Sequence, residues 1–412
     1  MRSMLRVFTS RRMAVVFLLG FSSGIPLGLT GSTLQAWMVS EKFDLALIGV
    51  FALVAWPYWG KFLWAPLMDR FVPPFLGRRR GWMLVMQLAL IVSISAMAFT
   101  SPAESRIALA AIAVLVAFFS ASQDIVIDAY RTEILDPDEL GAGTGLAVTG
   151  YRIAMLVSGA LALILADHLP WRTVYLIMAG AMSVGVVASL LAPEPKLALA
   201  PPRTLADAVV KPFVEFLRRH GAVEVLVFIF IFKLDVFVAQ AMTTPFLLGI
   251  GFSRTDIGTV TQGFGLISTI VGSLVGGALM VRLGMYRSLW TFGLLQGLSG
   301  LSFTVLALLG KNYPMMITAN IVENFCAGLG TVAYTAFIMS ICDKRFTATQ
   351  YALLTSLMAA ARNLVSAPTG WFAGIVGWPS YFVVATLIAI PGLLLLFRFK
   401  TWTRPVAGQD TI

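Results

Sequence analysis

The chain has 412 residues, of which 58% are hydrophobic and only 12% are charged. Soluble domains carry about 25% charged residues, so a mean hydropathy of +0.86 over this length excludes a soluble globular protein. The net charge of +10 does not indicate nucleic-acid binding, because the basic residues lie in short clusters between apolar segments and form no aromatic-rich basic face.

Apolar segments of membrane-spanning length follow one another along the whole chain. A helix needs about 20 apolar residues to cross the hydrocarbon core. The basic N-terminus resembles a signal peptide, but its apolar run continues past residue 30 without a small-residue cleavage site, so it is predicted to be the first span. The expected spans are 13–39, 45–67, 81–100, 106–130, 142–166, 171–192, 223–248, 255–281, 287–309, 314–341, 349–373 and 379–399. The sequence therefore predicts an all-α integral membrane protein with about twelve transmembrane helices.

The basic residues predict the orientation of these spans. An even number of spans places both termini on one side, and Lys and Arg gather on the cytoplasmic side. Of the 30 Lys and Arg residues, 21 lie at the termini and in the loops of that side. Five lie in the opposite loops, and the remaining four lie inside spans. Both termini are therefore predicted to be cytoplasmic.

A proline-rich loop at 193–222 divides the chain into two halves, 1–192 and 223–412, that repeat one another. The loop holds an amphipathic stretch from Thr204 to Arg219, which is typical of a helix at the membrane interface. Matching runs are separated by about 210 residues throughout, which supports a duplication of six spans. They are Phe43 to Gly49 with Phe252 to Gly258, Leu67 to Arg70 with Leu279 to Arg282, Arg152 with Arg362, and Trp171 to Tyr175 with Trp378 to Tyr381. Such repeats predict two pseudo-symmetric six-helix bundles with a substrate site between them.

Histidine and cysteine provide no metal site or catalytic cluster. His168 and His220 are the two histidines, and Cys326 and Cys342 are the two cysteines. Their spacing matches no metal motif, and both cysteines are expected to be free thiols. We predict no metal, no cofactor and no enzymatic activity.

The loop after the second expected span carries a charged motif. Ala65-Pro-Leu-Met-Asp69-Arg70 leads to Gly77-Arg78-Arg79-Arg80. This resembles the G-x-x-x-D-R-x-G-R-R signature of the major facilitator superfamily, with Ala65 in place of the first Gly and about five inserted residues. The resemblance implies that Asp69, Arg70, Arg78 and Arg79 form a latch that stabilises one conformational state. A basic loop that only sets topology is the alternative.

Two acids lie on one face of the fourth expected span. Asp124 and Asp128 are four residues apart and share a helix face, and an acid within a span is a candidate functional group by default. Asp128 lies near the cytoplasmic end, where Arg131 or the Asp69 loop can pair with it. Asp124 lies one turn deeper, and we expect it to couple transport to protons. An ion pair with Lys61 is the alternative.

Further polar side chains inside the spans are candidates for substrate binding. Lys233 and Asp235 are two residues apart and are not expected to share a face. Glu323 and Arg362 can pair, or Arg362 can bind a substrate carboxylate. Contacts between helices are the alternative for each residue. The full candidate set is Gln123, Lys61, Arg152, Tyr151, Trp37, Lys233, Asp235, Glu323, Asn324 and Arg362.

Several runs together resemble the AmpG muropeptide permease family along nearly the whole chain. The most specific is Ser120-Ala-Ser-Gln-Asp-Ile-Val-Ile-Asp-Ala129. The others are Leu19 to Leu27, Thr33 to Met38, Lys61 to Arg70, Gly77 to Trp82, Leu191 to Pro195, Glu323 to Cys326, Ala348 to Leu354 and Gly370 to Phe372. The resemblance implies a proton-coupled importer in the bacterial inner membrane. We expect it to be a monomer surrounded by lipid. Its substrates would be N-acetylglucosamine–anhydro-N-acetylmuramyl peptides from cell-wall breakdown.

Other functions stay open at this point. Related short family members import siderophores, so siderophore import is the main alternative. A membrane-embedded enzyme would need a catalytic cluster, which the sequence lacks. A passive channel would conduct without a proton gradient.

Overall fold

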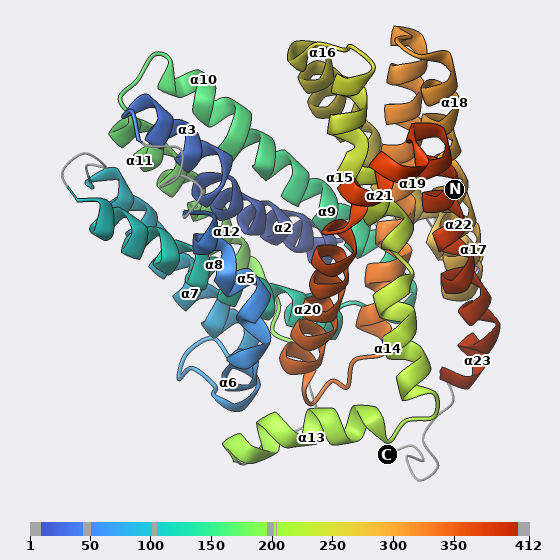
Figure 1. The fold of residues 1–412 in the computed structure, drawn as a ribbon. Helices are drawn as coiled ribbons and strands as arrows, with labels where there is room; N and C mark the ends of the chain where they lie inside the picture. Colours follow the sequence, from blue (N-terminus) through green and yellow to red (C-terminus); the bar gives the residue numbers. More distant parts are fainter. Residues whose placement is uncertain (1–9, 44–50, 101–104, 196–201, 203, 403–412) are drawn as a thin grey trace. The chain divides into compact units, whose positions relative to one another are not determined.

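The computed structural model describes residues 10–43, 51–100, 105–195, 202 and 204–402, and its described residues form helices and connecting turns (Figure 1). Parts of several sequence predictions, including the start of the expected span 45–67, lie outside these residues. They also include the first arginines of the N-terminal basic cluster, most of the repeated run 43–49, and part of the linker 193–222.

The chain divides into two compact units, each made of more than one segment. Unit 1 comprises residues 1–136, 146–210 and 342–353, and unit 2 comprises residues 137–145, 211–341 and 354–412. Three helices contain a point at which the chain passes from one unit to the other. They are α9 (Leu140–Leu156), α13 (Leu205–Leu217) and α20 (Thr347–Ser366).

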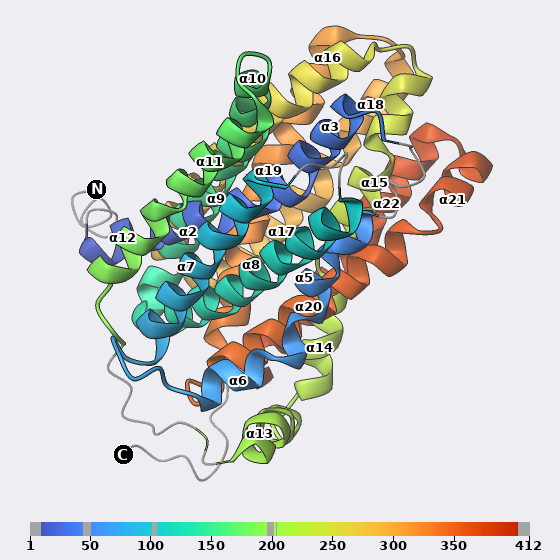
Figure 2. The ribbon, with the colours of Figure 1, turned by 90° about the vertical axis from the view of Figure 1, so that its left-hand side faces the viewer.

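Unit 1 is a bundle in which α7, α8 and α11 lie side by side and α2 packs on α8 and α12 (Figure 2). Its apolar core is formed by closely packed aliphatic and aromatic side chains between these helices. The elements are α2 (Arg11–Thr30), α3 (Ser32–Ser40), η1 (Phe51–Ala55), α5 (Trp56–Gly60), η2 (Lys61–Leu63), α6 (Ala65–Arg70), α7 (Arg78–Ala98), α8 (Arg106–Ile134), η4 (Val157–Leu161), α10 (Ala162–Ala166), α11 (Trp171–Ala181) and α12 (Ser183–Leu191).

Unit 2 is a second bundle, in which α17 packs along α19, and α22 packs against α15, α17 and α18. Phe246, Phe303 and Phe382 form the aromatic centre of its core. The elements are η3 (Pro137–Glu139), α14 (Ala222–Ile231), α15 (Leu234–Gly249), α16 (Arg254–Gly258), η5 (Thr259–Gly265), α17 (Leu266–Ser299), α18 (Leu301–Leu309), α19 (Tyr313–Ser340), α21 (Thr369–Val376), α22 (Trp378–Leu395), η6 (Leu396–Arg398) and α23 (Phe399–Trp402).

Eight helices in the described part of the chain are long and apolar enough to cross a membrane. Two of the twelve expected spans, 255–281 and 287–309, belong to one stretch of 56 residues whose helices are joined across a kink at Gly284. Residues 51–67 of the expected span 45–67, and the expected spans 223–248 and 349–373, are broken into shorter helices. The expected number of twelve therefore stays a prediction, while the all-α membrane fold is confirmed.

Candidate functional site

The predicted latch of unit 1 is a buried network of ion pairs around Arg79. The guanidinium Nη2 donates to Asp69 Oδ1 at 2.8 Å, and Nε lies 3.0 Å from both carboxylate oxygens of Glu133. Arg78 Nη2 also reaches Glu133, at 3.4 Å. Because Arg79 and both acids are buried, each charge depends on its partners for stabilisation.

Asp69 also holds the first turn of α20. Its carboxylate accepts hydrogen bonds from the backbone N–H groups of Ala348 at 3.2 Å and Thr349 at 2.8 Å, and from the Thr349 hydroxyl at 2.8 Å. A carboxylate at a helix N-terminus satisfies unpaired N–H groups and interacts favourably with the helix dipole. Asp69 therefore joins α6, α7 and the start of α20 within unit 1.

Arg70 lies outside this network, and two acids that the sequence did not single out lie within it or next to it. The Arg70 guanidinium lies 5.5 Å from the Phe71 ring centroid. Glu133 pairs with Arg79, and Glu194 accepts from the backbone N–H groups of Arg79 at 2.9 Å and Arg80 at 3.1 Å. Glu133 follows the Asp124–Asp128 face of α8 by little more than one turn, which is the signal that could have identified it.

The two acids on α8 differ in their partners. Asp128 Oδ1 accepts from Arg131 Nη2 at 2.7 Å, and its Oδ2 lies 4.0 Å from Lys61 Nζ. Arg131 Nη2 also donates to the hydroxyl of Tyr351 at 3.2 Å. Asp124 Oδ1 is buried and has no hydrogen-bond partner in the described part of the chain. Lys61 therefore pairs with Asp128, and Asp124 keeps an unsatisfied carboxylate oxygen.

Residues around Asp124 form a polar region inside unit 1. Gln123 is buried and accepts from Ser22 Oγ at 3.0 Å, while its Nε2 has no partner among the described residues. Tyr151 and Arg152 are half-buried on α9. The backbone of Gly24 on α2 packs directly against Tyr151. Unsatisfied polar atoms at membrane depth are costly, which makes this region the strongest candidate site of unit 1.

Trp37 lies in the apolar core of unit 1. Its side chain is only 4% exposed, and its ring centroid lies 4.9 Å from Tyr175 and 5.9 Å from Trp171. Trp37 therefore packs against two aromatic neighbours, and its assignment to the substrate site stays a prediction.

In unit 2, a buried glutamine joins Lys233 to Asp235. Lys233 Nζ donates to Gln296 Oε1 at 2.8 Å and to Thr331 Oγ1 at 2.9 Å. Gln296 Nε2 lies 3.1 and 3.2 Å from the two Asp235 oxygens. Both side chains reach α17, because the helix breaks at Lys233 (φ −108°, ψ 5°) before α15 begins.

Glu323 and Arg362 do not pair. Glu323 is buried and accepts from Ser299 Oγ at 2.6 Å. The Arg362 guanidinium instead lies 5.9 Å from the Phe237 ring centroid. Asn324 Oδ1 accepts from Thr269 Oγ1 at 3.3 Å, next to Asn320. The described part of unit 2 therefore holds two buried acids, Asp235 and Glu323, one buried lysine, and the amide groups of Gln296, Asn320 and Asn324.

Comparisons with known proteins agree with this fold. A model of the Major Facilitator Superfamily matches residues 16–366. The human organic anion transporter MFSD10 has a similar structure, with a TM-score of 0.70, 16% identity, and coverage of 94% of this chain and 99% of that one. The chain therefore belongs to the major facilitator superfamily, whose members are membrane transporters rather than enzymes.

The closer relatives define a narrower group. The anhydromuropeptide permease of Escherichia coli strain K12 is 47% identical over 95% of this chain and 80% of its own length. An uncharacterized protein of Haemophilus influenzae is 39% identical over 98% of this chain and 97% of its own length. Within the superfamily, the chain is a member of the AmpG permease family and a multi-pass protein of the inner membrane.

Proposed function

We propose that this chain imports anhydro-muropeptides across the inner membrane. The observation that carries this proposal is the 47% identity to the anhydromuropeptide permease of Escherichia coli over 95% of the chain. The half-buried cations Lys61 and Arg152 and the exposed cation Arg362 suit an anionic peptide. The amides of Gln123 and Asn324 suit sugar hydroxyl and acetamido groups. Lys233, Asp235 and Glu323, already engaged by neighbouring side chains, support the site in unit 2.

We propose that import is driven by protons through Asp124. A proton-coupling acid must exist both charged and neutral at membrane depth, which suits a carboxylate without a permanent cation. Asp128 has Arg131 and Lys61 as partners, whereas Asp124 Oδ1 has no hydrogen-bond partner among the described residues. In this mechanism, Asp124 takes up a proton from the periplasmic side, substrate binds, and both are released into the cytoplasm.

The latch supports an alternating-access cycle, in which the site opens to one side of the membrane at a time. Asp69 holds the first turn of α20 through three hydrogen bonds. Release of these bonds would free α20, so we propose that the latch stabilises one conformation of the cycle. We further propose that the chain acts as a monomer and that both termini are cytoplasmic, as the distribution of Lys and Arg indicates.

Uptake by the purified full chain in liposomes tests the proposal. A radiolabelled anhydro-muropeptide is supplied outside under an imposed proton gradient, with and without a proton ionophore. We expect saturable accumulation that the ionophore removes. Absence of uptake under the gradient would refute muropeptide import, and uptake unaffected by the ionophore would refute proton coupling and indicate a passive channel.

Siderophore import gains no support from the relatives described above. A ferric siderophore in the same liposomes provides the direct control. We expect no gradient-dependent uptake of the siderophore, and siderophore uptake without muropeptide uptake would reverse the substrate assignment.

A further inference from the structure

The latch motif of unit 1 has a shorter copy in unit 2, and both copies end at a glycine with a similar backbone conformation. Leu279-Met-Val281-Arg282 corresponds to Leu67-Met-Asp69-Arg70, and each run leads to a glycine. Gly77 has φ 83° and ψ −175°, and Gly284 has φ 73° and ψ 169°. Only glycine adopts this region without strain, so the turn has been retained in both copies.

The charges of the two copies differ. Val281 stands where unit 1 has Asp69, so the carboxylate that binds Arg79 in the first copy has no counterpart here. Arg287 follows Gly284 by three residues, as Arg80 follows Gly77. Arg80 donates to the carbonyl oxygens of Ser189 and Leu190. Arg287 is exposed, and its guanidinium makes no ion pair or hydrogen bond within the described residues.

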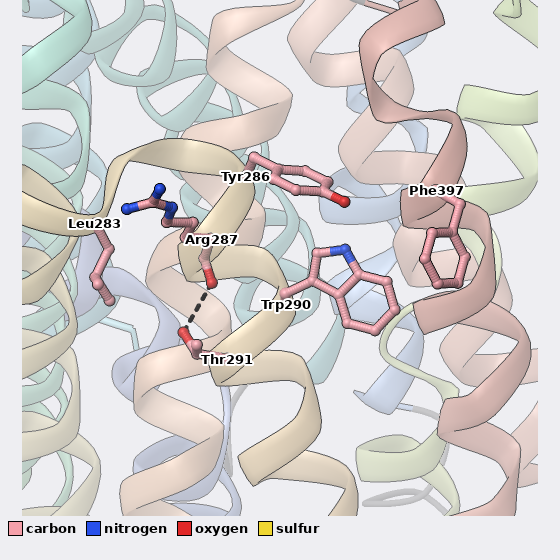
Figure 3. A pocket seen from close by; sticks show the side chains of 6 residues that line it. All are labelled: Leu283, Tyr286, Arg287, Trp290, Thr291 and Phe397. Carbon is pink, nitrogen blue, oxygen red and sulfur yellow. Dashed lines mark hydrogen bonds between the residues drawn. The ribbon is translucent and has the colours of Figure 1, made fainter.

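Beside Arg287 lies a surface groove with an apolar and aromatic lining. Its volume is about 490 Å³, and its wall consists of Leu283, Tyr286, Arg287, Trp290, Thr291 and Phe397. In Figure 3, Leu283 and Arg287 lie on one side of the helix and Tyr286 and Trp290 point toward Phe397. The Trp290 and Phe397 ring centroids are 5.0 Å apart. Phe397 is 69% exposed, so the aromatic surface is accessible from outside the protein.

The surroundings of the groove are basic. Arg282, Arg398 and Lys400 are exposed on the same unit. In the described structure, Glu224 lies close to the C-terminal helix α23. Its carboxylate already accepts hydrogen bonds from Arg398 and from the Trp402 indole N–H. The groove therefore combines an uncompensated guanidinium with an open apolar surface.

We propose that this groove binds an anionic phospholipid of the surrounding membrane. A guanidinium binds phosphate through paired, charge-assisted hydrogen bonds. The acyl chain would lie on Leu283, Trp290 and Phe397, and aromatic rings are common where the membrane meets water. Basic pockets next to spanning helices are suited to anionic headgroups. In this assignment, lipid phosphate binds the arginine of the second copy, whose counterpart Arg80 binds the carbonyl oxygens of Ser189 and Leu190 in the first copy.

Lipid binding to the full chain in detergent tests the assignment. Native mass spectrometry compares phosphatidylglycerol with phosphatidylcholine of the same acyl chains. We expect tighter binding of phosphatidylglycerol and about tenfold weaker binding after Arg287→Gln, because one charged hydrogen-bonded contact is lost. Arg254→Gln removes another exposed arginine of unit 2 and should leave binding unchanged. Equal binding by the two variants would overturn the proposal.

A second measurement locates the acyl chain. Phosphatidylglycerol with brominated chains should quench part of the tryptophan fluorescence, and Trp290→Phe should remove that part. Trp371→Phe, which replaces an indole that is 74% exposed on α21, is the matched control and should retain it. Quenching that is the same in both variants would contradict the location. Displacement of the lipid by inorganic phosphate alone would show a small-anion site and overturn the lipid assignment.

Discussion

Individual carboxylates have sharply different environments in unit 1. Asp69 is buried, pairs with Arg79 and accepts three hydrogen bonds from the start of α20. Asp128 lies a few residues from Asp124 on the same helix and has two cationic neighbours. Asp124 Oδ1 has no hydrogen-bond partner in the described part of the chain. These differences give each acid a separate expected role, as latch, ion pair and proton carrier.

Replacing Asp69 by Asn should destabilise the protein strongly. The substitution removes the negative charge beside buried Arg79, and breaking a buried ion pair costs roughly 3 kcal/mol. We expect a lower midpoint of thermal unfolding in detergent and slower transport. Asp138→Asn, at an exposed position of η3, should change neither, and equal unfolding midpoints for the two variants would contradict the buried network.

A methyl group at Gly330 should disrupt the polar network of unit 2. A Cβ at this position would overlap Gln296 Oε1, the atom that accepts from Lys233. Gly330→Ala should therefore lower the stability by about 1–3 kcal/mol, measured as a lower unfolding midpoint. Gly374→Ala on α21, where a Cβ meets nothing within 4 Å, should be neutral or slightly stabilising. If Gly330→Ala behaved like this control, the network would not be close-packed.

For individual residues, the sequence predicted which charged side chains lie inside the spans better than it predicted which residue each of them contacts. The pairing of Asp128 with Arg131 was foreseen because the two residues lie one turn apart on a helix. Glu133 was missed because its partner Arg79 lies 54 residues away in the sequence, and only the fold brings them together. Helical spacing alone did not reveal that Lys233 and Asp235 both reach Gln296, because the helix breaks at Lys233.

At the scale of helices, the apolar segments predicted the spans but not the breaks within them. The expected span 223–248 is interrupted at Lys233, and this break lets both Lys233 and Asp235 reach Gln296. Two further expected spans meet at Gly284, whose backbone is not helical. The distribution of apolar residues along the chain predicts where the helices lie. It does not predict where a spanning helix breaks and thereby changes the direction of a side chain.

The turn at Gly284 should depend on glycine for its backbone conformation alone. A Cβ meets nothing within 4 Å at either Gly284 or Gly258, but only Gly284 has a positive φ, of 73°. Gly284→Ala should therefore cost about 1–2 kcal/mol, while Gly258→Ala, within α16, should not destabilise. Unfolding midpoints of the two variants in detergent provide the comparison, and equal midpoints would show that the turn is unstrained.

At the scale of the whole molecule, the fold class and family were predictable because they depend on composition and on long runs of residues. The apolar runs required a helical membrane protein, and the repeated motif led to the superfamily that the comparisons confirm. The exact division of the chain into two units could not be predicted from the sequence. Residues 137–145 belong to unit 2 and residues 342–353 to unit 1. The contacts that place these short segments in their units leave no periodic pattern in the sequence.

The central claim, that Asp124 couples muropeptide import to protons, is tested most directly by comparing two modes of transport in liposomes. Asp124→Asn should abolish gradient-driven accumulation of the anhydro-muropeptide, since a neutral amide cannot exchange a proton. It should retain exchange of labelled for unlabelled substrate without a gradient, which shows that the variant is folded and binds. Asp138→Asn should match the unmodified chain in both modes. Gradient-driven accumulation by Asp124→Asn equal to that of the unmodified chain would contradict the account.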